Sequence, residues 1–248
     1  MIDTEKGAGR PGQIVLACDT STRVGSVALV EDGELSAETL LKFPAGSNPS
    51  RRLAKDIASM LEQRGIEPSD IDLLVTSLGP GSFTGVRIAI STMKGLAFAL
   101  DRPLKGVCSL DALADPLLGR GAAVMTALDA RRKEVYCALY SSDGKTLVAP
   151  AAMTAEEIAK LAADRCEGRV IGAGEGIAAY MDDFRRVLGD RLVPAPSGLN
   201  VIRASSVAFV GMTHPRPDLE PMYCRRSEAE AKLDQVALGA TVSPRKAN

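Results

Sequence analysis

Short apolar runs and amphipathic segments alternate along this chain, and their order predicts an α/β protein. Apolar runs of strand length are separated by polar turns, and longer segments repeat apolar residues at helical spacing. The first half is expected to contain strands at 14–18, 24–30, 35–41, 71–77 and 104–108, and helices at 51–64, 83–100 and 111–118. The second half is expected to contain strands at 123–129, 135–140 and 169–171, and helices at 154–163, 177–188 and 205–212.

The pattern of the first half restarts after about residue 120, which indicates an internal repeat. Each copy opens with an apolar strand that ends in an aspartate, followed by a polar hairpin, a second strand and an Asp-Gly turn. At an offset of 110 residues, Ala17, Asp19, Ala28 and Leu29 recur as Ala127, Asp129, Ala138 and Leu139. The repeat predicts two similar lobes, an arrangement that resembles the actin/hexokinase/Hsp70-like (ASKHA) fold.

The repeat also suggests domain boundaries. We expect a first lobe at 13–108 and a second lobe at 109–230, whose C-terminal part could pack back on the first. Polar, Gly/Pro-rich ends at 1–12 and 231–248 are expected to be flexible tails.

Composition adds limits on function. The 248 residues suffice for a substantial core, and 46% of them are hydrophobic. The net charge of −1 argues against a protein that grips nucleic acid unaided. Short basic clusters at 51–52, 131–133 and 225–226 are interpreted first as solvated surface.

The cysteines and the start of the chain indicate a cytoplasmic protein. There are five cysteines, an odd number, and no Cys-x-x-Cys pair. Cys18, Cys108 and Cys137 lie in apolar, strand-like runs and are expected to be small buried hydrophobic residues. No signal-peptide pattern is seen at the start, and no apolar run is expected to approach membrane-spanning length.

A glycine-rich loop, GPGSFTGVR at 79–87, joins a predicted strand to a predicted helix. A loop at a helix N-terminus could hold an anion, but it could equally be a tight turn that allows close packing. It lacks the Gly-Lys-Ser/Thr ending of a phosphate-binding P-loop, and it is not a dinucleotide-binding fingerprint.

The strand-terminal aspartates are the candidate residues of a nucleotide cleft. Asp19 and Asp129 could orient magnesium or an attacking water, or each could cap its own hairpin. Relatives with working phosphate hairpins usually have glycine after this aspartate, whereas Thr20 and Ala130 follow here. The cleft could be completed by Gly172 and Gly174 of a second glycine loop, whose spacing also fits close strand–helix packing.

Histidine chemistry is excluded by composition. His214 is the only histidine and lies beside Pro215, so a histidine metal site and a Ser-His-Asp or Cys-His nucleophile are not expected. No metal ligand set is assigned.

Five blocks of the sequence resemble the TsaB (YeaZ) family, and they occur in the family's order. They are IVLACDTSTRVGSVAL from Ile14, GPGSFTGVRIAISTMKGLAFAL from Gly79, CSLDALA from Cys108, ALDARRKEVYCALY from Ala127 and PMYCRRSEAE from Pro221. The resemblance implies the ASKHA fold and a non-catalytic subunit of the bacterial complex that transfers threonylcarbamoyl to adenosine 37 of ANN-decoding tRNAs.

The resemblance also implies partners and an interface. The partners would be the catalytic paralogue TsaD and the ATPase TsaE, with tRNA bound only in the complex and a homodimer formed when the partner is absent. The interface would lie on the first-lobe helices at Arg51, Leu53, Ile57, Thr84, Arg87, Ile88, Ser91 and Gly95. The segment 48–53, NPSRRL, departs from an NHSERL-like family pattern.

The resemblance implies no tightly bound cofactor, although weak ATP or ADP binding remains open, above all in the complex. Two other functions remain possible at this point. The chain could be a small-molecule kinase of the same fold, or a self-standing nucleotide- or nucleic-acid-binding module.

Overall fold

The computed structural model describes residues 12–43 and 49–224. The tail predicted at 231–248, and all but Gly12 of the tail predicted at 1–12, lie outside the described residues. Within them the chain forms two five-stranded mixed sheets. The α/β class and the two duplicated, hairpin-opened lobes predicted from the sequence are confirmed.

The first sheet has the strand order β3-β2-β1-β4-β5. Its strands are β1 (Ile14–Asp19), β2 (Val24–Glu31), β3 (Glu34–Lys42), β4 (Leu73–Ser77) and β5 (Leu104–Val107). The first three strands are antiparallel neighbours joined by hairpins, whereas β4 runs parallel to β1 and β5 runs parallel to β4.

The second sheet repeats this topology, with the order β10-β9-β6-β7-β8. Its strands are β6 (Ala123–Asp129), β7 (Glu134–Tyr140), β8 (Thr146–Thr154), β9 (Val170–Ala173) and β10 (Leu192–Pro194). Strands β6, β7 and β8 pair antiparallel, and β9 and β10 join in parallel. Asp19 and Asp129 are therefore the last residues of equivalent strands, as the repeat predicted.

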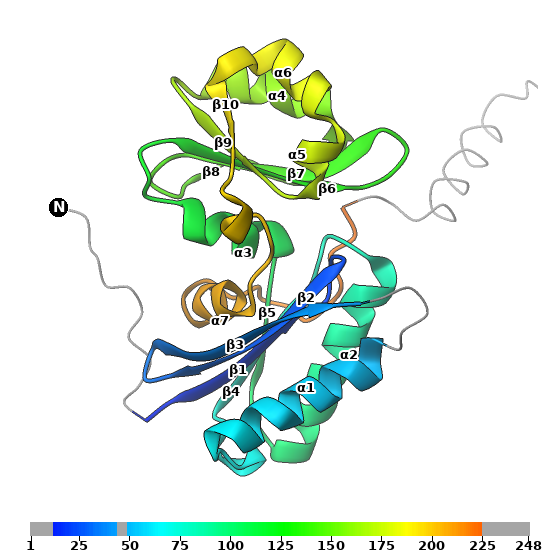
Figure 1. Ribbon diagram of the computed structural model, residues 1–248, viewed down its shortest axis with the longest axis vertical. Coiled ribbons are helices and arrows are strands. Elements are labelled where there is room, and N and C mark those ends of the chain that lie inside the picture. Colours follow the sequence, from blue (N-terminus) through cyan, green and yellow to red (C-terminus); the bar gives the residue numbers. More distant parts are fainter. Residues whose placement is uncertain (1–11, 44–48, 225–248) are drawn as a thin grey trace, which may run out of the picture.

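Helices form three layers around the two sheets (Figure 1). The α-helices are α1 (Pro49–Arg64), α2 (Phe83–Leu100), α3 (Ser109–Ala114), α4 (Ala155–Arg165), α5 (Glu175–Ala179), α6 (Met181–Leu188) and α7 (Ala204–Thr213). Short 3-10 turns lie at Pro68–Asp70, Asp115–Leu117, Gly189–Arg191 and Ser197–Leu199. Helices α1 and α2 cover the outer face of the first sheet, α4 and α6 cover the outer face of the second, and α3 and α7 lie between the sheets.

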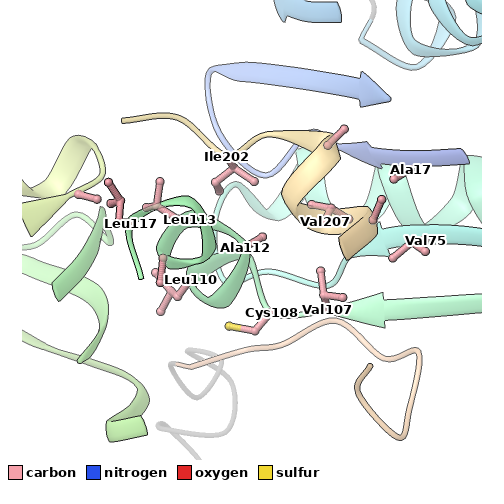
Figure 2. Packing of buried hydrophobic residues seen from close by; sticks show 14 of the residues in the cluster. Ala17, Val75, Val107, Cys108, Leu110, Ala112, Leu113, Leu117, Ile202 and Val207 are labelled. Carbon is pink, nitrogen blue, oxygen red and sulfur yellow. The ribbon is translucent and has the colours of Figure 1, made fainter. Parts of the chain in front are cut away.

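The two lobes share a hydrophobic core through the middle layer (Figure 2). Ala17 and Val75 of the first sheet pack with Val207 of α7, while Leu110 and Leu113 of α3 extend the same cluster toward the second sheet. Helix α7 contacts β1, β2 and β4, so the chain returns to the first lobe after completing the second. The space between the lobes is therefore largely filled by side chains.

Two strands and one helix break were not predicted. Strand β8 carries Pro150 and lies at the edge of its sheet, where proline is tolerated, while β10 is an edge strand of three residues. The helix predicted at 177–188 is two helices, because Tyr180 between them leaves the helical conformation (φ −123°, ψ 31°). The apolar period continues across this single residue, so the pattern hides the break.

Helix α2 corrects another expectation. Its 18 residues are long and apolar enough, by length and composition, to cross a membrane. The helix nevertheless packs Val86, Ala89, Ile90 and Met93 inward, and it contacts β4. A helix that covers a sheet of a globular lobe satisfies the same test.

Candidate functional site

The strand-terminal aspartate of the first lobe is buried. Asp19 has no exposed surface, and Thr20 and Ser21 beside it are also buried. The hydroxyl of Ser21 donates to the Asp19 carboxylate at 2.6 Å, the Ser21 N–H donates at 3.2 Å, and the Ser77 hydroxyl from β4 donates as well. The carboxylate is thus surrounded by protein donors instead of facing a cleft.

Burial changes the acidity of this group. It raises the pKa of Asp19 from 3.8 to about 6, because the charged form loses its hydration. The hydrogen bonds from Ser21 and Ser77 favour the charged form and offset only part of this effect. The group therefore has the environment of a structural carboxyl in a hydroxyl-lined pocket.

The glycine-rich loop predicted as a candidate anion site covers this hairpin. The Ser82 N–H donates to the carbonyl oxygen of Ser21 at 2.6 Å, and the Thr20 hydroxyl donates to the carbonyl oxygen of Gly85 at 2.6 Å. A Cβ added at Gly81 would lie 2.3 Å from the Ser21 oxygen, and one at Gly85 would lie 1.9 Å from the Thr20 oxygen. These glycines allow the loop to pack directly on the hairpin.

The loop also starts α2. The Ser82 hydroxyl accepts from the Gly85 N–H at 3.2 Å, which caps the helix N-terminus. Since the cap is satisfied by the loop's own serine and the Ser82 N–H by the first hairpin, the loop is organised for packing.

Asp129, the equivalent residue of the second lobe, is exposed and serves its own hairpin. Its carboxylate accepts from the Arg131 N–H at 2.8 Å and from the Tyr180 hydroxyl at 3.2 Å. This is the local capping role that short polar side chains commonly adopt at strand ends. The two repeated aspartates therefore have different surroundings: Asp19 is buried and Asp129 is exposed to solvent.

The second glycine loop is also closed by packing. The Gly174 N–H donates to the Asn200 side-chain oxygen at 2.6 Å, and a Cβ at Gly174 would lie 2.1 Å from the Ala127 carbonyl oxygen. A Cβ at Gly172 would lie 2.9 Å from the Leu192 side chain. Both glycines thus bring the loop against β6 and β10.

A small cavity remains between the lobes. Its volume is about 150 Å³, whereas ligand pockets commonly measure roughly 300–1,000 Å³. It is lined by Thr22, Arg23, Val24, Leu113, Leu128, Gly174, Glu175, Asn200, Val201 and Ile202. Of the predicted cleft residues only Gly174 lines this cavity, whereas Asp19 and Asp129 do not. Within the described ranges 12–43 and 49–224, no group of three or more His, Cys, Asp or Glu side chains could hold a metal ion.

The outer side of α2 is the second candidate site. A stripe of residues follows the alternating spacing of four and three that places side chains along one helix face. We call this the α2 stripe, and its members are Thr84, Ile88, Ser91, Gly95 and Phe98. Ile88 is half-buried and the other four residues are exposed; Phe98 is 91% exposed. Small residues at 91 and 95 would allow a second helix to approach closely.

Arg87 lies beside the N-terminal end of the α2 stripe in an aromatic cluster. Its guanidinium lies over the Phe83 ring at 3.9 Å and donates to the Tyr223 hydroxyl at 3.2 Å. The Phe83 and Tyr223 rings stack with 5.8 Å between their centroids. Arg87 is therefore held in place by two exposed aromatic residues from distant parts of the chain.

Two of the predicted interface residues are buried within the chain. Leu53 and Ile57 of α1 are 0% and 4% exposed and pack in the core of the first lobe, so their side chains do not face outward. Arg51 is exposed, as are Thr84, Arg87, Ser91 and Gly95 on α2. Sequence reasoning missed Phe98 and Tyr223; for Phe98 the signal was present, since it continues the four-three spacing.

Comparisons with known proteins agree on one family. Residues 44–232 match the family model described as TsaD: tRNA N6-adenosine threonylcarbamoyltransferase. The tRNA threonylcarbamoyladenosine biosynthesis protein TsaB of Bacillus subtilis is 33% identical, over 88% of this chain and 96% of its own length. TsaB of Escherichia coli is 32% identical, over 88% of this chain and 97% of its own length. The solved structure of YeaZ from Pseudomonas aeruginosa is 28% identical, with a TM-score of 0.68, over 85% of this chain and 99% of that one.

Proposed function

Because this chain belongs to the TsaB (YeaZ) family of tRNA threonylcarbamoyladenosine biosynthesis proteins, we propose that it acts there as a non-catalytic subunit. In this proposal it docks through α1 and α2 onto the catalytic TsaD-type transferase and makes that enzyme competent. The pathway follows from the family, and the proposed docking mode rests on the geometry of α2.

The observation that carries the proposal is the exposed α2 stripe. A helix that packs one side on its own sheet has no need for a second side with helix-packing spacing, yet α2 has one. Its small residues at Ser91 and Gly95 suit close helix approach, and Phe98 offers a large apolar contact at the far end. A catalytic partner of the same fold would present an equivalent helix pair.

Gly95 gives the proposed contact its most specific support. No atom lies within 4 Å of the position that a Cβ would take at Gly95, so the residue faces open space in the single chain. Glycine in a helix interior costs stability, roughly 0.5–1 kcal/mol relative to alanine. Close approach of a partner helix gives a reason for this residue that the isolated chain does not provide.

The cleft supports an accessory role. The Asp19 carboxylate is occupied by Ser21 and Ser77, and the glycine-rich loop lies on the hairpin that would otherwise face a phosphate. The cavity of about 150 Å³ between the lobes is small for a nucleotide. A small-molecule kinase would need this cleft, so that alternative is disfavoured.

The remaining partners follow from the same assignment. We propose that tRNA is bound only by the assembled complex in the cytoplasm, that the ATPase TsaE joins this complex, and that any weak ATP or ADP binding occurs there. Without the transferase, the exposed α2 stripe can pair with that of a second copy in a two-fold dimer.

The test is co-expression of the chain with the TsaD-type protein of the same bacterium, followed by size-exclusion chromatography with light scattering. Gly95→Arg places a long charged side chain on the α2 stripe. Gly198→Arg is the matched control, because Gly198 also faces open space and lies in the second lobe.

Wild type and Gly198→Arg are expected to run as a heterodimer, and Gly95→Arg as separate species with unchanged circular dichroism. If Gly95→Arg assembles as well as wild type, α2 is not the docking surface. If wild type does not assemble even with nucleotide and the ATPase present, the accessory-subunit proposal fails.

A further inference from the structure

The tip of the β6–β7 hairpin combines charge with an unusual backbone. Arg131, Arg132 and Lys133 are consecutive, exposed and basic. All three have positive φ values, of 61°, 54° and 64°. Non-glycine residues visit this left-handed region singly and at an energetic cost, so three in a row form a strained turn.

The surrounding structure holds this turn in place. The Asp129 carboxylate accepts from the Arg131 N–H at 2.8 Å, and the Glu134 N–H donates to the Arg131 carbonyl oxygen at 3.0 Å. Tyr180, at the break between α5 and α6, adds its hydroxyl to Asp129 at 3.2 Å. The break between α5 and α6 therefore places the Tyr180 side chain within hydrogen-bonding distance of Asp129, which precedes the hairpin tip.

The equivalent hairpin of the first lobe shows that the repeat does not require this arrangement. There the residues after the strand, Thr20 and Ser21, are buried under the glycine-rich loop and have no strained basic turn. Of the two hairpins, only the second has three consecutive exposed residues at its tip. Folding alone would favour glycine at positions with positive φ. Charged residues that keep this strained backbone at an exposed turn therefore point to a binding role.

We propose that the basic tip Arg131–Lys133 is a phosphate-contact site for the RNA substrate in the assembled complex. This inference rests on the proposed function, which supplies a polyanionic RNA as the substrate of the complex. Arginine forks pair bidentately with phosphate oxygens, and lysine adds a point charge. A fixed turn loses little freedom when it binds, which favours contact with a regular phosphate backbone.

The near-neutral charge of the whole chain agrees with this role. With a net charge of −1, the chain has no surplus of positive charge to bind RNA alone. A local basic tip can nevertheless add contacts once a partner holds the RNA. The tip therefore contributes affinity and orientation to the complex and reads no base sequence.

The test measures binding of an unmodified ANN-decoding tRNA transcript to the wild-type complex with the TsaD-type protein, between roughly 50 and 200 mM salt. The variant is the triple replacement Arg131→Gln, Arg132→Gln, Lys133→Gln. The matched control is Lys160→Gln, Arg169→Gln, Arg185→Gln, which removes the same charge from exposed positions of the same lobe. Heterodimer formation is measured in parallel by light scattering.

The tip variant is expected to assemble normally and to bind tRNA about tenfold or more weakly, with the slope of log K against log salt reduced by roughly 2–3. The control is expected to stay within about twofold of wild type. Equal affinity and slope for tip variant and wild type would overturn the inference. A second result would also overturn it. If the tip variant forms the heterodimer only at higher protein concentration, and this heterodimer binds tRNA as tightly as wild type does, the tip contacts an acidic protein surface and not RNA.

Failure of the proposed function would look different, because the wild-type heterodimer itself would be absent. The inference would then fall together with the proposed function. A heterodimer that forms, but in which the tip variant binds tRNA as tightly as wild type does, overturns the inference alone.

Discussion

The hydroxyl of Thr20 donates a 2.6 Å hydrogen bond to the carbonyl oxygen of Gly85, 65 residues further along the chain. This contact closes the first hairpin under the loop that starts α2. The same packing buries Asp19 and fixes the N-terminus of the helix whose outer face carries the α2 stripe. The covered cleft and the exposed helix face are thus two results of one interaction.

Adding a methyl group at Gly85 should break this closure. The new Cβ would lie 1.9 Å from the Thr20 carbonyl oxygen, so Gly85→Ala is expected to lower the free energy of unfolding by about 2–4 kcal/mol. Gly95→Ala on the same helix meets no atom within 4 Å and is expected to raise it by about 0.5–1 kcal/mol. Urea unfolding of both variants provides the measurement, and equal effects would contradict the packing role of Gly85.

The pH dependence of stability should report Asp19. Its pKa is raised from 3.8 to about 6 in the folded protein, so the folded state holds this proton more tightly than the unfolded chain. The contribution is present below about pH 4 and is lost as pH rises toward 6, a change of about 3 kcal/mol.

Asp19→Asn removes this titration. The difference in unfolding free energy between variant and wild type should therefore shift in favour of the variant by about 2 kcal/mol between pH 4 and pH 7. Other carboxyl groups cancel in this difference. Parallel pH profiles for the two proteins would show that folding does not raise the pKa of Asp19.

A partly buried ion pair should anchor α7 to the first lobe. Glu38 of β3, whose side chain is 5% exposed, accepts from Arg203 and also from the Ser205 N–H (2.9 Å) and hydroxyl (2.8 Å) at the start of α7. Glu38→Gln leaves the partly exposed Arg203 without its counter-charge and is expected to cost about 2 kcal/mol in thermal or urea unfolding. Glu34→Gln on the same strand is exposed and serves as the control, with an expected change below about 0.5 kcal/mol. Similar losses for both variants would exclude a specific anchoring role.

The sequence predicted the duplicated lobes and the bounds of α2 because both depend on local signals. Ser82 caps the helix, Asp101 ends it in a left-handed conformation, and the apolar period is continuous between them. The repeated strand–aspartate–hairpin order likewise needs only neighbouring residues.

The candidate site was harder to predict because it depends on contacts between distant residues. The stripe of Leu53 and Ile57 identified an apolar face of α1, but periodicity does not tell whether such a face meets its own sheet or a partner. The burial of Asp19 is produced by a loop more than 50 residues away, and Arg87 is held by Tyr223, 136 residues away. No local pattern contains this information.

The most direct test of the account is reconstitution of tRNA threonylcarbamoylation with the TsaD-type transferase, the ATPase and a source of threonylcarbamoyl-adenylate, with the modified nucleoside measured by mass spectrometry. The account predicts full modification with wild type and with Glu175→Gln, which alters the lining of the cavity between the lobes, and modification reduced at least tenfold with Gly95→Arg, which blocks the α2 stripe. Loss of modification with Glu175→Gln in a complex that still assembles, together with normal modification by Gly95→Arg, would assign the function to the cavity and contradict the account.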